Sequence, residues 1–362
     1  MVRSPRLIGP LAALFLTLNY SPIQAVILYR TVDPSANNAA PGLVFPHEGW
    51  DYEGSWGGFL GTAIAPHFFI SAAHIGQAGW TTFTLQNVNY TVLRGFYDPQ
   101  SDLVIWQVAQ TFPTFASLYP RPDEVSQVTV DIGRGTQRGA SYSLNNQMLG
   151  WLWGPQDGVE RWGENRFSDA FQYGTNWDLL YATFDQGSDL TEECTLSSGD
   201  SGGAAFISDM SDGGKWKLAG INYAVDGNYS ESANGSNPFT GALFDTRGLY
   251  AQQGSQWVLV TGAAAVPTGF YPTRISTKLA WIASVVASPV GGHESNFATL
   301  TYTKLTDIPI SYSIEQSTDF VNWTTATTID ETISTSGNAA IVKSKVDMAG
   351  LSPLFLRVRT TQ

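Results

Sequence analysis

Short apolar runs bounded by turn-forming residues occur along most of the chain. Runs of about four to eight residues, rich in β-branched and aromatic side chains and separated by Gly, Pro or Asn, predict strands. The clearest runs are Val26–Tyr29, Gly58–Ala65, His67–Ser71, Tyr90–Phe96, Leu103–Val108, Val128–Ile132, Leu179–Phe184, Ala204–Ser208, Lys217–Asn222, Gly241–Tyr250 and Gln256–Thr261. We therefore expect an all-β protein in which strands follow one another through short turns.

One helix interrupts this pattern. Leu279, Ile282, Ala283 and Val286 recur at the spacing of one helical face, and Ser276 is a suitable N-cap residue. The polar stretch Asp226–Thr240 predicts a long surface loop before it. The helix is expected to close a first domain that covers residues 26–288.

The last part of the chain predicts a second domain. Residues 289–295 contain two adjacent glycines and are predicted to be a linker. Alternating runs follow at Phe297–Tyr302, Ile308–Ile314, Ala339–Val346 and Leu354–Val358. This pattern favours a small β-sandwich over residues 296–362.

Residues 1–25 have the features of a secretory signal peptide. Arg3 and Arg6 precede the apolar segment Leu7–Tyr20, and Ala25 offers a small residue for cleavage. We expect a secreted or periplasmic protein that begins at Val26, with an uncleaved membrane anchor as the alternative. No later segment is long and apolar enough to predict a membrane span.

The composition narrows the possible partners. The 362 residues carry 19 Lys and Arg against 31 Asp and Glu, which disfavours nucleic acid and anionic membranes as partners. A single cysteine, Cys194, excludes an internal disulfide and is interpreted as a buried apolar residue rather than a nucleophile. Histidines and cysteines are too few for a zinc site, so neither a metal nor a cofactor is expected.

The stretch Gly199–Gly203 has the composition of a nucleophile loop. Ser201 follows Asp200 and precedes two glycines, which leave its hydroxyl uncovered. The N–H groups of Gly199 and Ser201 can stabilise an oxyanion. An ordinary turn is the alternative interpretation.

A serine nucleophile requires a base, and His74 is the best candidate. It follows the apolar run Phe69–Ala73 at the end of a predicted buried strand, whereas His67 follows Pro66 at a predicted turn. A fixed imidazole next to a serine hydroxyl is the arrangement that general-base activation needs.

Several motifs in order resemble the trypsin-like serine proteases of the chymotrypsin fold, in particular secreted bacterial members. They are Ser71–His74, Ser101–Trp106, Gly199–Gly203, Trp216–Ile221 and Tyr271–Ile282. The resemblance covers residues 26–287 and implies a double β-barrel domain with a C-terminal helix. It also implies a serine endopeptidase that acts on protein or peptide substrates, and we expect a monomer.

The resemblance implies roles for individual residues. Ser201 would attack the scissile carbonyl, His74 would move the proton, and Asp102 would orient the imidazole. Thr195, Val225 and Gly269 would surround the substrate pocket, with Val225 favouring a small or medium apolar residue before the scissile bond. A new N-terminus at Val26 would pair with Asp200. Tyr223 and Ala224 depart from the family pattern, which usually has Ser and Trp there.

Two other functions remain open on the sequence. Gly199–Gly203 also satisfies the nucleophile-elbow pattern of serine esterases, in which His293 would have to act as the base. A trypsin-like domain that has lost catalysis and serves as a binding protein is the other alternative. The second domain carries no recognisable chemistry, and we expect it to bind a surface or a substrate, or to act as a spacer.

Overall fold

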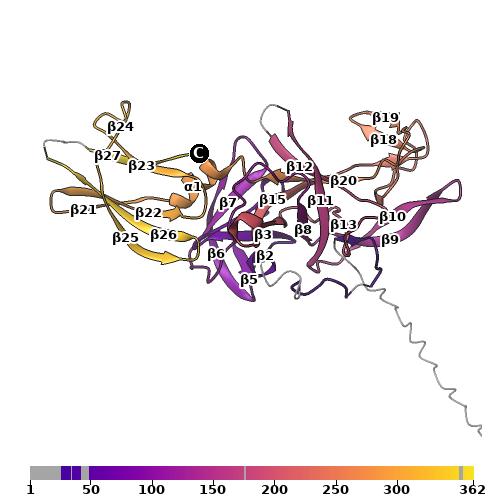
Figure 1. Ribbon diagram of the computed structural model, residues 1–362, viewed down its shortest axis with the longest axis horizontal. Coiled ribbons are helices and arrows are strands. Elements are labelled where there is room, and N and C mark those ends of the chain that lie inside the picture. Colours follow the sequence, from indigo (N-terminus) through magenta and orange to yellow (C-terminus); the bar gives the residue numbers. More distant parts are fainter. Residues whose placement is uncertain (1–25, 34, 42–48, 175–176, 350–353) are drawn as a thin grey trace, which may run out of the picture.

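The structure is a computed structural model that describes residues 26–33, 35–41, 49–174, 177–349 and 354–362. The predicted signal peptide, residues 1–25, lies outside these residues. In Figure 1 two barrels occupy the middle of an elongated molecule, the C-terminal sheets lie at the left, and β9, β10, β18 and β19 lie at the right.

The first barrel is a closed sheet of six antiparallel strands in the order β2-β3-β4-β7-β6-β5. Its strands are β2 (Glu53–Trp56), β3 (Phe59–Ala65), β4 (Phe68–Ala72), β5 (Thr82–Leu85), β6 (Val88–Tyr97) and β7 (Leu103–Val108). The turn between β5 and β6 consists of Gln86 and Asn87, both at positive φ (49° and 62°). Such a two-residue turn matches the twist of the strands and fixes their register.

The second barrel is also closed and six-stranded, in the order β11-β12-β20-β15-β14-β8. Its strands are β8 (Val128–Gly133), β11 (Arg161–Tyr173), β12 (Trp177–Thr183), β14 (Ala204–Asp209), β15 (Lys215–Val225) and β20 (Gly269–Arg274). The short strand β1 (Ile27–Leu28) pairs with β13 (Cys194–Thr195) beside this barrel. The two closed barrels confirm the prediction of an all-β double-barrel fold.

Two small sheets extend from the second barrel. One contains β9 (Thr136–Leu144), β10 (Gln147–Gln156) and β17 (Gly241–Leu243), and the other contains β16 (Tyr229–Ser230), β18 (Tyr250–Gln253) and β19 (Gln256–Leu259). We call these two sheets, with the loops that join their strands, the inserted lobe. Leu149, Tyr229, Leu243 and Leu249 form a buried cluster within it, so the lobe has a core of its own.

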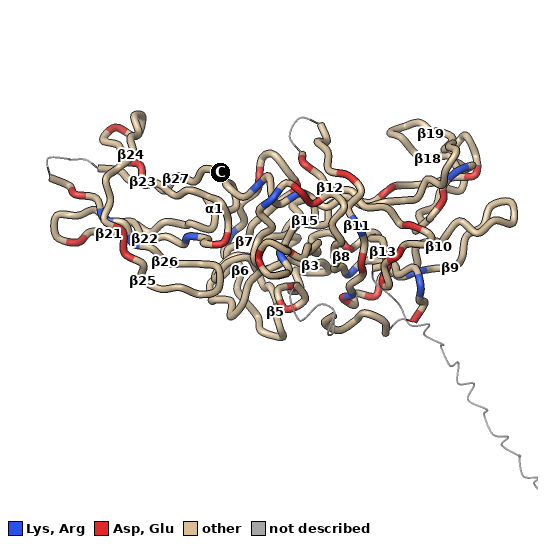
Figure 2. The backbone as a smooth tube through the Cα atoms, viewed as in Figure 1, with Lys and Arg blue, Asp and Glu red and all other residues tan. Residues whose placement is uncertain are grey.

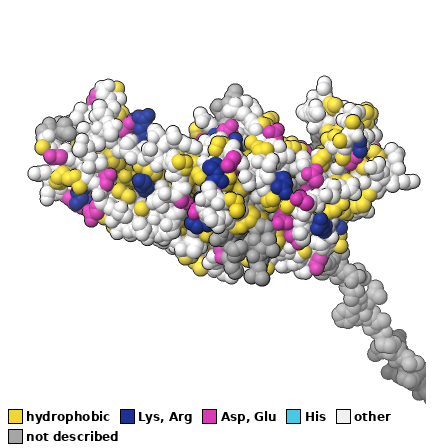
Figure 3. Space-filling view, in the orientation of Figure 1, with side chains coloured by type: hydrophobic (Ala, Val, Ile, Leu, Met, Phe, Trp, Pro, Cys, Tyr) yellow, Lys and Arg dark blue, Asp and Glu magenta, His cyan; other side chains and the backbone are white. Residues whose placement is uncertain are grey.

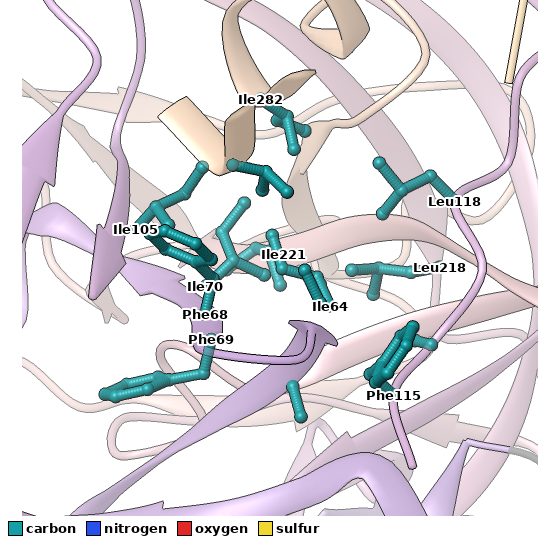
Figure 4. Packing of buried hydrophobic residues seen from close by; sticks show 14 of the residues in the cluster. Ile64, Phe68, Phe69, Ile70, Ile105, Phe115, Leu118, Leu218, Ile221 and Ile282 are labelled. Carbon is teal, nitrogen blue, oxygen red and sulfur yellow. The ribbon is translucent and has the colours of Figure 1, made fainter. Parts of the chain in front are cut away.

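The largest hydrophobic core joins the two barrels. It includes Phe69 and Ile105 from the first barrel, Leu218 and Ile221 from the second, and Ile282 from the helix (Figure 4). Aromatic side chains fill much of it, with the rings of Phe69 and Phe83 stacked 3.9 Å apart. The junction between the barrels is therefore packed with apolar side chains.

The helix α1 (Leu279–Ala287) buries the predicted apolar face, but it begins after Lys278 rather than after Ser276. The predicted cap is wrong: the Ser276 hydroxyl donates to Oε1 of Glu124 at 2.5 Å, the N-cap position is Lys278, and no described side chain accepts from the first helical N–H groups as a cap. The segment predicted as a linker, 289–295, contains the strand β21 (Val290–Glu294), which pairs with β22. Its glycines are accommodated because β21 is an edge strand.

Residues 290–362, which we call the C-terminal module, form two further sheets. One contains β21, β22 (Phe297–Leu305), β26 (Ala339–Asp347) and β25 (Ile329–Ser336); the other contains β24 (Thr324–Thr325), β23 (Ser311–Ser317) and β27 (Phe355–Thr361). Leu300, Val342 and Ile314 belong to one buried cluster that draws on both sheets, as expected for a sandwich.

The C-terminal module packs directly on the helix and on the segment that follows β7 of the first barrel. Leu305, Ile308 and Ile310 belong to the core that joins the barrels. Asn338 Nδ2 donates to the carbonyl oxygen of Ala116 at 3.2 Å, and the Thr360 hydroxyl donates to that of Ala280 at 2.8 Å. The module is thus part of the packed body.

Basic residues are spread along the chain without one large cluster (Figure 2), and hydrophobic side chains are interspersed with polar ones on the face shown in Figure 3. Among the described residues, no helix has the length and apolar character needed to cross a membrane.

Candidate active site

His74 and Asp102 come from the ends of neighbouring strands in the first barrel. The strand β4 runs into a 3-10 turn, Ala73–Ile75, and Asp102 immediately precedes β7. The backbone N–H of Ala73 donates to the carbonyl oxygen of Asp102 at 2.9 Å, and that of His74 donates to Asp102 Oδ1 at 2.9 Å. These bonds fix the two side chains relative to each other.

Three side chains form a continuous hydrogen-bonded chain across the barrel junction. His74 Nδ1 lies 2.6 Å from Asp102 Oδ2, and His74 Nε2 lies 2.8 Å from Ser201 Oγ. Asp102 is 5% exposed, whereas the His74 side chain is 40% exposed. A carboxylate that accepts from Nδ1–H leaves Nε2 as the acceptor for a serine proton, which is the geometry of a general base beside its nucleophile.

The loop that carries Ser201 is held by backbone hydrogen bonds to β15. The N–H of Gly202 donates to the carbonyl oxygen of Asn222 at 3.0 Å, and the N–H of Asn222 donates to that of Gly203 at 2.9 Å. A Cβ at Gly203 would collide with the carbonyl oxygen of Ile132. Glycine is therefore required for the close approach of this loop to the second barrel.

The two N–H groups predicted to bind an oxyanion have no partner within the described part of the chain. Gly199, at φ 100°, and Ser201 donate no backbone or side-chain hydrogen bond there, whereas Asp200, Gly202 and Gly203 do. These two donors flank the nucleophile and remain free for a ligand.

Asp200 is buried beneath this loop, 1% exposed, and several donors satisfy its carboxylate. Oδ1 accepts from the N–H of Gly135 at 2.6 Å, and Oδ2 accepts from the N–H of Ser197 at 2.7 Å. The backbone N–H of Val26 also donates to it, while burial raises its pKa to about 6. The structure thus brings Val26 and Asp200 together.

Val26 itself is completely buried and has a φ of 47°. A β-branched residue rarely adopts a positive φ because its side chain clashes with the backbone. The structure therefore holds a strained backbone at the residue where the predicted mature chain begins.

A cavity of about 300 Å³ opens beside Ser201. Val225 lines it, as predicted, but Thr195 and Gly269 do not. Thr195 is buried in β13 opposite Ile27, and the N–H of Gly269 donates to Asp226 Oδ2 at 2.7 Å behind the cavity wall. Trp153 and Thr240 from the inserted lobe, with Asn222 and Asp226, form walls that sequence reasoning missed.

Tyr223, which departs from the pattern of the family that the sequence resembles, lies beside His74. Its ring lies edge-on to the His74 ring at 5.9 Å between centroids, and it makes a second edge-on contact with the Trp177 ring at 5.1 Å. Burial and the charge of Asp102 raise the pKa of the Tyr223 hydroxyl. Within the described residues, the hydrogen bonds to the Asp102 carboxylate come from His74 alone.

The remaining candidates lie away from this site. His293 is exposed in β21, paired with Ala298 in the C-terminal module, so the imidazole next to Ser201 is not the one that an esterase order requires. Cys194 is buried, and burial raises its pKa well above the usual value, which keeps the thiol protonated. Among the described residues, no group of three or more His, Cys, Asp or Glu is arranged to hold a metal ion.

Comparisons with known proteins found a distant structural similarity. No family model matches the chain, and no curated protein matches it. Among solved structures, the Rv3671c protease of M. tuberculosis in its active form is similar, with a TM-score of 0.37 and 16% identity over 77% of this chain and 93% of that one. Its inactive form gives a TM-score of 0.33 and 18% identity over 62% of this chain and 82% of that one.

Proposed function

We propose that the protein is a serine endopeptidase that hydrolyses peptide bonds through an acyl-enzyme. The observation that carries this proposal is the chain of hydrogen bonds Asp102···His74···Ser201, which spans 2.6 and 2.8 Å beside an open cavity. The positions of the three residues support the proposal: His74 and Asp102 lie at strand ends of the first barrel, and Ser201 lies in the loop before β14 of the second barrel.

In the proposed reaction, Ser201 Oγ forms a bond to the scissile carbonyl carbon as His74 Nε2 takes its proton. The carbonyl oxygen becomes an oxyanion that accepts hydrogen bonds from Gly199 and Ser201. Collapse breaks the C–N bond, and the imidazolium returns the proton to the leaving amine. Water then repeats the sequence on the acyl-enzyme, and Asp102 stabilises the imidazolium in both halves.

The environment of Asp200 supports a role for a free N-terminus at Val26. Cleavage before Val26 would convert its N–H donor into an ammonium group next to a buried carboxylate, and it would release the constraint on φ. We propose that residues 1–25 direct export of the enzyme from the cytoplasm. Their removal then activates the enzyme. The test compares two chains, one beginning at Val26 and one beginning a residue earlier. Equal activity of the two chains would overturn this proposal.

The experiment that tests the endopeptidase proposal uses residues 26–362 and the matched variant Ser201→Ala. Both proteins are treated with a fluorescent phosphonate and with a set of peptide amides. Labelling and hydrolysis by the wild type alone are the expected result. A folded wild type that neither reacts with the phosphonate nor cleaves any peptide would contradict the proposal.

A further inference from the structure

The imidazole of His74 is in contact with an aromatic side chain from the second barrel. The rings of His74 and Tyr223 meet edge-on, with 5.9 Å between their centroids and 75° between their planes. Tyr223 lies in β15, directly after Asn222, whose N–H donates to the carbonyl oxygen of Gly203 in the loop that carries Ser201. The second barrel therefore contacts the base as well as supplying the nucleophile.

Tyr223 is itself packed against the hairpin of β11 and β12. The ring of Trp177, the first residue of β12, makes an edge-on contact with Tyr223 at 5.1 Å between centroids and 78° between planes. Tyr173, Gly174, Trp177 and Tyr223 line one cavity of about 240 Å³, so these aromatic groups surround a common space. Because Tyr223 has this second contact, its ring is less free to turn and can restrain the imidazole.

The side chain of Tyr223 acts here as a neutral ring. Burial and the charge of Asp102 raise the pKa of its hydroxyl, so the phenol stays protonated at neutral pH. In the described part of the chain, the Asp102 carboxylate accepts hydrogen bonds from His74 alone. The Tyr223 hydroxyl therefore does not orient this carboxylate by a hydrogen bond, and its contribution to the three residues is packing.

Packing matters most in the second half of the proposed reaction, and the inference rests on that proposed function. In the free enzyme, hydrogen bonds of 2.6 and 2.8 Å hold the imidazole between Asp102 and Ser201. When Ser201 Oγ is bonded to the acyl group, it has no proton to donate, so the hydrogen bond to Nε2 is lost. The imidazole, whose side chain is 40% exposed, is then held by Asp102 at Nδ1 and by the ring of Tyr223.

We propose that Tyr223 is a positioning residue that keeps the His74 imidazole in place for hydrolysis of the acyl-enzyme. In this step a water oxygen forms a bond to the acyl carbon as His74 Nε2 takes its proton. The bond from the acyl carbon to Ser201 Oγ then breaks, and the imidazolium returns the proton to Oγ. Displacement of the base by about 1 Å can lower the rate of such a step about 100-fold, and the ring of Tyr223 prevents that displacement.

The test measures acylation and deacylation separately in residues 26–362, with an activated p-nitrophenyl ester that gives a burst when the acyl-enzyme accumulates. Tyr223→Ala should lower the deacylation rate about 10- to 100-fold. It should lower the acylation rate less, because Ser201 still holds the imidazole when acylation begins. Tyr223→Phe keeps the ring and should retain both rates. A deacylation rate that falls no more than the acylation rate in Tyr223→Ala would overturn the inference.

Two further variants change aromatic contacts without altering β15. Trp177→Ala removes the ring that packs against Tyr223 and should lower the deacylation rate by a smaller factor than Tyr223→Ala. Phe320→Ala is the matched control, because it removes an edge-on contact with Trp323, at 6.3 Å between centroids, in the C-terminal module. It should change neither rate. A deacylation rate that falls as much in Phe320→Ala as in Tyr223→Ala would contradict the inference.

The tautomer of His74 provides a measurement that does not depend on activity. Ser201→Ala removes the hydrogen bond at Nε2, as acylation does, while the bond to Asp102 keeps the proton on Nδ1. In this background, nitrogen-15 resonances of the imidazole should report one tautomer with Tyr223 or Tyr223→Phe. With Tyr223→Ala they should shift toward the average of two tautomers. Unshifted resonances with Tyr223→Ala would contradict the inference.

Phosphonate labelling separates this inference from the endopeptidase proposal. A wild type that labels at Ser201, together with a Tyr223→Ala variant that deacylates at the wild-type rate, would contradict the inference and leave the endopeptidase proposal standing. A folded wild type that neither labels nor hydrolyses the ester or any peptide would overturn both.

Discussion

The two barrels carry different additions, and the contrast between them separates support from specificity. The C-terminal module packs on α1 and on the segment that follows β7 of the first barrel, and it contributes Leu305, Ile308 and Ile310 to the apolar core that joins the barrels. The inserted lobe packs beside the second barrel and contributes Trp153 and Thr240 to the cavity beside Ser201. One addition is built into the framework, whereas the other lines the cavity beside Ser201.

The anchoring of the inserted lobe reinforces this contrast. Arg138 on β9 stacks over the Trp151 ring at 3.9 Å and donates to the carbonyl oxygens of Leu28 and Tyr29 at 3.1 and 2.7 Å. The lobe therefore holds the segment that follows Val26. Changes in the lobe are expected to alter substrate preference first, and changes in the C-terminal module to alter stability first.

The largest predicted effect is a loss of kcat on substitution of residues at the junction of the two barrels, where neither addition takes part. His74→Ala and Ser201→Ala should each lower kcat by about a millionfold, and the double variant should be no worse than either, because the proposed mechanism uses the two residues as a unit. Steady-state kinetics on one peptide amide measures all three, with circular dichroism as the control for folding. If the loss of kcat in the double variant equals the product of the two single losses, His74 and Ser201 act independently, and the proposed mechanism is contradicted.

Next in size is an effect on stability alone. Leu305 is 1% exposed, and Leu305→Ala should lower the free energy of unfolding by about 2–5 kcal/mol, because it leaves a cavity in the shared core. Chemical denaturation measures this loss, and kcat of the folded enzyme should not change. Ile329→Ala, at an exposed site on β25, is the matched control and should have little effect. A fall in kcat with Leu305→Ala would break the contrast between the two additions.

The inserted lobe should show the opposite behaviour. Trp153→Ala removes a wall of the cavity and should lower kcat/KM by about 10- to 100-fold, a range typical of lost pocket contacts. The Trp153→Ala variant should still react with a phosphonate probe that has no side chain to fill the cavity, at a rate close to that of the wild type. If Trp153→Ala lowers the free energy of unfolding as much as Leu305→Ala does, the inserted lobe also supports the framework, and the contrast between the two additions fails.

The smallest predicted effect is a pH dependence at the base of the lobe. Burial raises the pKa of Asp226 above its usual 3.8, so in the pH range between the usual and the raised pKa the folded state binds more protons than the unfolded state. The folded state therefore loses stability as the pH rises from the usual pKa through the raised one. Asp226→Asn removes this titration, so its stability relative to wild type should rise from pH 4 to higher pH. Urea denaturation at several pH values tests the sign, and a relative stability that falls with pH would contradict it.

Functional residues could be predicted from the sequence where one short motif contains both the residue and the structure that positions it. His74, Asp102 and Ser201 each lie in a motif with a strand end or a glycine loop, and the structure joins all three by hydrogen bonds. Ser276 shows the limit of such reasoning. Its hydroxyl suits a helix cap, but the partner it finds is Glu124, far away in the sequence.

The cavity walls were the hardest part to predict. Thr195 and Gly269 were placed by resemblance to a family pattern, and the wall is instead completed by an insertion that the pattern does not contain. The hairpin of β9 and β10 was missed because its strands expose residues on both faces and show weak alternation. The Asn145–Asn146 turn, with φ values of 51° and 64°, was the signal that could have located it.

The single thiol gives the protein a built-in reporter of local motion. Cys194 is completely buried in β13, and its strand partner is Leu28 in the two-residue strand β1. A thiol reagent can reach the sulfur only when the packing around β13 opens, because the thiol is buried among Val26, Leu28 and side chains of the second barrel. The rate of modification under native conditions therefore measures how often this part of the second barrel opens, without any introduced probe.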